Sequence, residues 1–167
     1  MFQALSSKII SGFISLSMLL LSSYEGNRAA FAELTASFLG DKIFIKTELV
    51  HAFENDFEEI FKSGQRIDIF FSIELKNQSV VIHENEFKHS VVFNPLSQFF
   101  TIGLEEQNIS TTTDSYQELI DIISKVEYQY EGEELNEVNI SIKSFLKKIR
   151  LQSINKEYDM MMLWKFK

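Results

Sequence analysis

The chain has 167 residues, enough for one domain with its own core, and its formal net charge of −8 argues against a basic face for nucleic acid or anionic lipid. The absence of cysteine excludes thiol catalysis, disulfides and thiolate metal sites. Sixteen phenylalanines against a single proline exclude a disordered or low-complexity chain.

Residues 1–32 are expected to be an export signal. Lys8 supplies a basic start, residues 9–21 form an apolar run expected to be a signal helix, and Ala30-Phe31-Ala32 has the small-x-small pattern of a cleavage site. One β-rich domain is then expected over residues 33–167. The alternative is an uncleaved anchor as the chain's membrane contact, although the run is shorter than the roughly 20 residues of a membrane-spanning helix.

The first expected elements of the domain are a strand over residues 43–49 and a short amphipathic helix. Asn55 can cap this helix, Phe57 and Phe61 belong to its apolar face, and Gly64 can end it in the left-handed conformation. Alternation of apolar and polar residues, with Phe70 as the only exception, then predicts a half-buried antiparallel strand. The residues expected on its buried face are Ile67, Ile69, Phe71, Ile73 and Leu75.

Further strands are expected over residues 80–82, 90–93, 99–106, 126–130 and 138–142. Residues 83–89 are interpreted as a polar interruption, and residues 108–114 as a threonine-rich turn. Asp114 or Ser115 can cap a second helix after that turn. The apolar residues expected on the buried face of this helix are Tyr116, Leu119, Ile120 and Ile123.

The end of the chain predicts a last strand, because apolar residues alternate from Tyr158 to Phe166. Residues 144–151 fit a helical turn and a strand equally well and stay unassigned. The whole pattern predicts a mainly β (α+β) fold, an antiparallel β-sandwich-like domain of seven or eight strands with two short helices. The alternative is a single sheet with both helices on one face.

The order of these features resembles a known family. The matching segments are the signal peptide, the helix end at Ser63-Gly64, the strand over residues 69–75, residues 93–100 and the closing residues 163–166. In these segments the chain is similar to the secreted bacterial domain-of-unknown-function family numbered forty-three ninety. The resemblance implies export to the periplasm or cell envelope of a bacterium. It implies no established activity and therefore no catalytic residue.

His83, Glu86 and His89 are candidate metal ligands. On one extended strand the two imidazoles would lie roughly 20 Å apart, too far to share one ion. A turn at Glu84-Asn85 could bring them together. A solvated hairpin turn is the favoured interpretation, because a metal site also needs oriented partners behind its ligands. No metal, cofactor or catalytic residue is therefore expected.

Several aromatic residues lie outside the main apolar face of the strand that carries them. They either fill the second face of a sandwich or form a binding surface for a partner, and a clustered exposed patch would favour the second interpretation. The residues of this candidate binding surface are Phe70, Phe99, Tyr158, Trp164 and Phe166.

These patterns predict a non-enzymatic function. The favoured hypothesis is an exported, non-catalytic binding or assembly module that contacts another envelope protein. The first alternative is a carrier of an apolar small molecule, which needs a lined cavity of some 300 to 1,000 Å³. The second is a carboxylate-based hydrolase, in which His51, His83 or His89 would have to meet acidic residues in one cleft.

Overall fold

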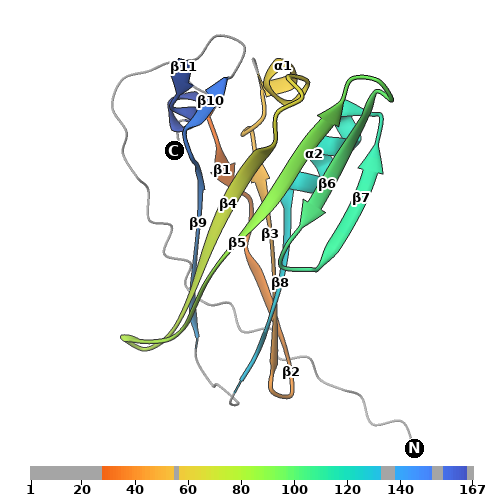
Figure 1. Ribbon diagram of the computed structural model, residues 1–167. Coiled ribbons are helices and arrows are strands. Elements are labelled where there is room, and N and C mark those ends of the chain that lie inside the picture. Colours follow the sequence, from red (N-terminus) through yellow and green to blue (C-terminus); the bar gives the residue numbers. More distant parts are fainter. Residues whose placement is uncertain (1–27, 55–56, 133–137, 152–155, 165–167) are drawn as a thin grey trace, which may run out of the picture.

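The computed structural model describes residues 28–54, 57–132, 138–151 and 156–164, and these form two antiparallel sheets that face each other (Figure 1). The larger sheet has the strand order β7-β6-β5-β4-β9. Its strands are β4 (Ile67–Asn77), β5 (Val80–Asn94), β6 (Phe99–Leu104), β7 (Ile109–Thr113) and β9 (Asn139–Leu146). The hydrophobic core lies between the sheets, so the predicted sandwich-like architecture is confirmed and the single-sheet alternative is wrong.

The smaller sheet is built around β3 (Lys42–Val50), which has a partner on each side. One side pairs with β8 (Lys125–Glu131), and the other with β1 (Ala30–Phe31) and β2 (Thr35–Leu39). A separate hairpin joins β10 (Ile149–Leu151) to β11 (Lys156–Tyr158). The described residues thus hold eleven strand segments, more than the seven or eight expected.

Strand β4 is the centre of the core, as its alternation predicted. It lies between β5 and β9, and its five inward side chains are at most 1% exposed. They are Ile67, Ile69, Phe71, Ile73 and Leu75. Because full burial of one such side chain contributes about 1.5–3 kcal/mol, this face of β4 fixes the register of the sheet.

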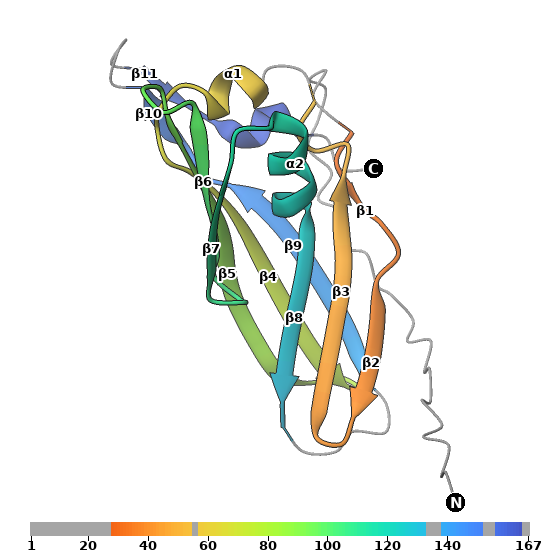
Figure 2. The ribbon, with the colours of Figure 1, turned by 90° about the vertical axis from the view of Figure 1, so that its right-hand side faces the viewer.

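Two short α-helices close one end of the sandwich (Figure 2). Helix α1 (Phe57–Phe61) buries Phe57 and Phe61, and Gly64 follows with φ +76°, the left-handed conformation expected at the helix end. Helix α2 (Tyr116–Ser124) begins at Ser115, whose hydroxyl accepts the N–H of Glu118. The helix packs against β6 and β7 on one side and β3 and β8 on the other.

The predicted last strand is wrong, because a 3-10 helix, η1 (Met160–Leu163), carries the chain into the core. Asp159 caps η1 by accepting the N–H of Met161. Trp164 follows, 2% exposed, and its indole N–H donates to the carbonyl of Ala52 over 2.7 Å. Its ring lies 5.9 Å from Phe53 and stacks on Phe57 at 6.2 Å. A buried indole needs both an apolar pocket and an acceptor, and this position supplies both.

Two expected turns are strands. The polar stretch 83–89 lies inside β5, because its inward polar side chains have hydrogen-bond partners across the core. Residues 109–113 form β7, paired with β6 in unbroken register. Threonine is β-branched and suits an extended strand, so the threonine-rich stretch continues the sheet. The unassigned residues 144–151 end β9 and form β10.

The expected domain boundary between residues 32 and 33 falls inside the smaller sheet. Ala29 is fully buried, and β1 pairs with the end of β3. The N–H of Ala32 donates to the carbonyl of Glu48 over 2.7 Å. The domain therefore includes at least residues 29–32. The apolar run of the expected signal, residues 9–21, lies outside the described residues, and within the described part no helix is long and apolar enough to cross a membrane.

Candidate functional site

An aromatic pair lies on the outer face of the larger sheet, the face turned away from β3 and β8. Phe70 of β4 is paired in register with Phe145 of β9. The two rings stack with centroids 5.2 Å apart and planes at 12°, and both side chains are only half-buried. The solvent-facing side of an antiparallel sheet normally holds hydrophilic residues, so an outward aromatic pair is unusual at this position.

Two lysines lie over this aromatic pair. Nζ of Lys147 is 3.8 Å from the centre of the Phe70 ring, and Nζ of Lys88 is 5.8 Å from the same ring. Each such contact contributes about 0.5–1 kcal/mol when exposed to solvent. Lys147 also lies 3.9 Å from the carboxylate of Glu86. The pair is thus an apolar platform rimmed by positive charge.

Asp68 links this platform to a neighbouring hollow. Its carboxylate accepts from Nε of Arg66 over 2.8 Å and from Nζ of Lys88 over 3.1 Å. The side chains are partly exposed, so the two ion pairs add little to stability. They do hold both basic side chains in defined positions beside the sheet.

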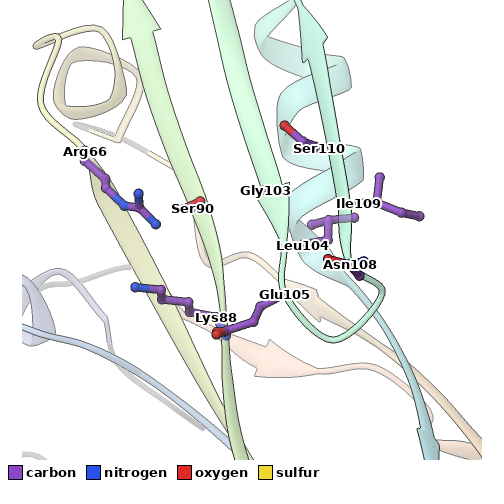
Figure 3. A pocket seen from close by; sticks show the side chains of 9 residues that line it. All are labelled: Arg66, Lys88, Ser90, Gly103, Leu104, Glu105, Asn108, Ile109 and Ser110. Atoms are coloured by element: carbon purple, nitrogen blue, oxygen red, sulfur yellow. The ribbon is translucent and has the colours of Figure 1, made fainter.

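The hollow has a volume of about 280 Å³ and crosses β5, β6 and β7 on the outer face (Figure 3). Its floor consists of the small residues Ser90, Gly103 and Ser110, which are register neighbours. A Cβ at Gly103 would lie 2.8 Å from Oγ of Ser90, so glycine keeps this floor open. Arg66 and Lys88 extend from one side, and the β6–β7 turn forms the other.

Inside the sandwich, His89 and Glu106 form an ion pair with no exposed side-chain surface. Nε2 of His89 lies 3.0 and 3.1 Å from the two carboxylate oxygens, and Nδ1 lies 2.8 Å from the carbonyl of Ile123. Both ring nitrogens thus lie within hydrogen-bond distance of oxygen atoms. The pair ties β5 to the β6–β7 turn and to the end of α2.

The pKa of Glu106 is below its ordinary value of 4.5. Burial by itself raises this pKa. The hydrogen bond and charge of His89, together with a hydrogen bond from Gln107, favour the carboxylate more strongly and lower it. The paired groups therefore stabilise each other in the core.

His83 belongs to a second interior cluster. Its Nε2 lies 2.7 Å from the hydroxyl of Tyr128, which also accepts from Nδ2 of Asn85 over 3.2 Å. The His83 ring packs against Tyr130 at 4.7 Å. Burial raises the pKa of Tyr128 above 10, so this hydroxyl stays protonated and can donate to His83.

The three candidate metal ligands are not brought together. β5 continues without a turn through Glu84 and Asn85, with His83 and His89 inward on separate partners and Glu86 outward. Across the described parts of the chain, no three His, Cys, Asp or Glu side chains lie close enough to hold a metal ion. His51 is exposed and bonded to Glu54.

The candidate aromatic surface is only partly present. Phe70 lies on the outer face and Phe99 is 43% exposed at the start of β6, whereas Trp164 is a core residue and cannot contribute to a surface. Tyr158 lies in β11, with its side chain outside the described part, and Phe166 is outside the described residues. Phe145 was missed because residues 144–151 had no assigned period.

Comparisons with protein-family models, with curated proteins and with solved structures gave no match. The resemblance to the family numbered forty-three ninety stays a prediction. The function is therefore argued from the geometry of this chain, since a fold class alone does not determine function.

Proposed function

We propose that this protein is an exported, non-catalytic binding module of the bacterial envelope, and that the outer face of its larger sheet contacts a partner protein. The observation that carries the proposal is the outward Phe70–Phe145 pair beneath Lys147 and Lys88. Aromatic residues are enriched in protein contact surfaces and often contribute most to the binding free energy.

The chemistry of the surface defines the kind of partner it suits. An apolar side chain can pack on the phenylalanine rings when Lys147 swings away from Phe70. A carboxylate can replace Glu86 near Lys147 or approach Arg66 at the hollow. The partner is therefore proposed to present an apolar residue with an acidic residue nearby.

The hydrolase alternative receives no support from the described histidines. His89 and its acidic partner Glu106 are closed off from solvent, and His83 is bonded to Tyr128. The residues that line the hollow include no histidine. A hydrolytic site would require such groups to converge on bound substrate.

The carrier alternative would require an enclosed apolar cavity. The hollow described above instead lies on the outer surface, and charged and polar side chains such as Arg66 and Lys88 line it together with the apolar Leu104 and Ile109. Its volume of about 280 Å³ is also at the small end for a ligand site. A surface contact fits these features better.

The proposal is tested by capture from envelope extracts with three immobilised baits. The wild type is compared with the double variant Phe70→Thr/Phe145→Thr, which keeps strand-forming residues but removes both rings. Phe99→Thr is the matched control, because it removes an exposed ring from β6 outside the platform. Thermal unfolding of each bait checks that the fold is intact.

The expected result is a protein captured by the wild type and by Phe99→Thr and lost with the double variant. Equal capture by all three baits, or no capture above background, would reject the outer face as the binding surface. When a protein is captured, a chemical crosslink between it and Lys147 would locate the contact independently.

A further inference from the structure

The larger sheet ends at β7, and within the described residues β7 pairs only with β6. Figure 1 shows no strand beyond it. Its sequence, Ile-Ser-Thr-Thr-Thr, has no charge and no proline, and its register with β6 contains no bulge. Charge, proline and bulges are the features by which natural sheets protect an edge from pairing. Among the described strands, β7 is therefore an edge that can accept another strand.

The hydrogen-bond alternation identifies the free backbone groups of this edge. The N–H of Glu105 donates to the carbonyl of Lys88. Counting back along β6 from Glu105, every second residue therefore forms its backbone hydrogen bonds with β5. The residues between them form their backbone hydrogen bonds with β7. The β7 residues paired with those in-between residues are Ile109, Thr111 and Thr113. Ser110 and Thr112 therefore direct both N–H and C=O away from the sheet.

Other sheet edges differ from β7. The edge strand β8 carries the exposed charges Lys125, Glu127 and Glu131, and β9 carries the exposed Lys143. Such charges oppose pairing with another strand. β2, with the sequence Thr-Ala-Ser-Phe-Leu, is also an uncharged edge strand and serves below as the internal comparison.

We propose that β7 pairs antiparallel with β7 of a second copy of this chain, about a two-fold axis at Thr111. In this register Ser110 of one copy lies opposite Thr112 of the other, and each pair exchanges two backbone hydrogen bonds. The four outward groups of each copy are then all bonded. The contact is self-complementary, as a two-fold interface requires.

The side chains of β7 suit this arrangement. On the outer face the hydroxyls of Ser110 and Thr112 meet across the axis, a favourable cross-strand pair. Ile109, which is 47% exposed, lies opposite Thr113 of the second copy and becomes partly covered. In a chain of net charge −8, an uncharged strand lets two copies approach without like charges lying opposite each other.

This interface goes beyond the proposed function. The Phe70–Phe145 platform lies on β4 and β9, at the other side of the same sheet, although Ile109 and Ser110 of β7 also line the hollow. A dimer through β7 would give one continuous sheet with a platform toward each end. The variants Phe70→Thr/Phe145→Thr and Thr112→Pro change different residues, so failure of one proposal is distinguishable from failure of the other.

Sedimentation velocity of the full chain, over a series from about 1 µM to about 1 mM, tests the proposal through a reversible monomer–dimer equilibrium. Thr112→Pro removes one outward N–H per copy and leaves the bonds between β6 and β7 in place. Because the symmetry doubles the loss, the dimer should weaken at least about tenfold.

Ala36→Pro is the matched control on β2. The N–H of Gly132 donates to the carbonyl of Asp41, so by the same alternation Ala36 directs its N–H away from β3. This variant should dimerise like the wild type. A chain that is monomeric at every concentration, a dimer that survives Thr112→Pro, or one lost equally with Ala36→Pro would overturn the proposal.

Amide hydrogen exchange of the wild type gives a readout that needs no variant to fold. The amides of Ser110 and Thr112 should exchange fast in dilute solution and slow down as concentration rises. The amide of Thr111, bonded to β6 in each copy, should be protected throughout. Concentration-independent fast exchange at Ser110 and Thr112 would also overturn the proposal.

Discussion

His89 and Glu106 hold each other inside the sandwich, with Nε2 of the imidazole 3.0 Å from the carboxylate and neither side chain exposed. The pair joins three segments that are distant in sequence, because the same imidazole bonds the carbonyl of Ile123 at the end of α2. Removing two charges from water costs a large desolvation free energy. A fold that buries one member without its partner is therefore less stable than a fold that buries both.

Breaking this pair should destabilise the domain strongly. His89→Ala leaves Glu106 as a buried, unpaired carboxylate, and the expected loss is about 3–5 kcal/mol in the free energy of unfolding. The double variant His89→Leu/Glu106→Leu removes both charges and should recover a large part of that loss. Urea denaturation measures the three proteins, and a loss below about 1 kcal/mol for His89→Ala would contradict the ion pair.

The same pair predicts an acid-dependent loss of stability. The pKa of Glu106 is lower in the folded protein than its ordinary value of 4.5, so the unfolded chain binds more protons below that pH. The contribution of Glu106 is fully present above about pH 4.5 and is lost as the pH falls through the folded pKa. Denaturation of wild type and Glu106→Gln between about pH 7 and about pH 3 should show their difference shrinking with acid. A difference that stays constant over this range would rule the mechanism out.

The floor of the hollow gives a prediction on packing. Gly103→Ala places a Cβ 2.8 Å from Oγ of Ser90 and should destabilise the domain by about 1–3 kcal/mol. Adding Ser90→Ala removes that oxygen and should restore most of the lost stability, which a double-mutant cycle measures directly. Additive effects of the two substitutions would show that they do not touch.

The first strand predicts where a functional domain must begin. A chain that starts at residue 33 lacks Ala29, β1 and the bond from Ala32 to Glu48. It should unfold more easily than a chain that starts at residue 28, by about 1–3 kcal/mol. Urea denaturation compares the free energies of unfolding of the two chains. Equal stability would mean that β1 contributes nothing.

The elements with strong local patterns were predictable from the sequence. β4 alternates with Phe70 as its one exception and buries every residue expected on its inward face. Gly64 ends α1 with positive φ, as its lack of a Cβ allows. In these segments local propensity and tertiary burial favour the same structure.

The missed elements depend on contacts that a local pattern does not contain. The stretch 83–89 seemed too polar for a strand because the partners of His83 and His89, namely Tyr128 and Glu106, lie far along the chain. Trp164 was expected on a surface because its acceptor, the carbonyl of Ala52, is 112 residues away. The Phe70–Phe145 pair likewise depends on the register of β4 with β9.

The position of Trp164 has a consequence for how the core assembles. The indole that completes the Phe53–Phe57 cluster donates to the carbonyl of Ala52, 112 residues earlier, and β9 pairs with the central strand β4 across another long stretch of sequence. Because contacts between segments so far apart in sequence require the closure of long loops, this end of the core should form late in folding.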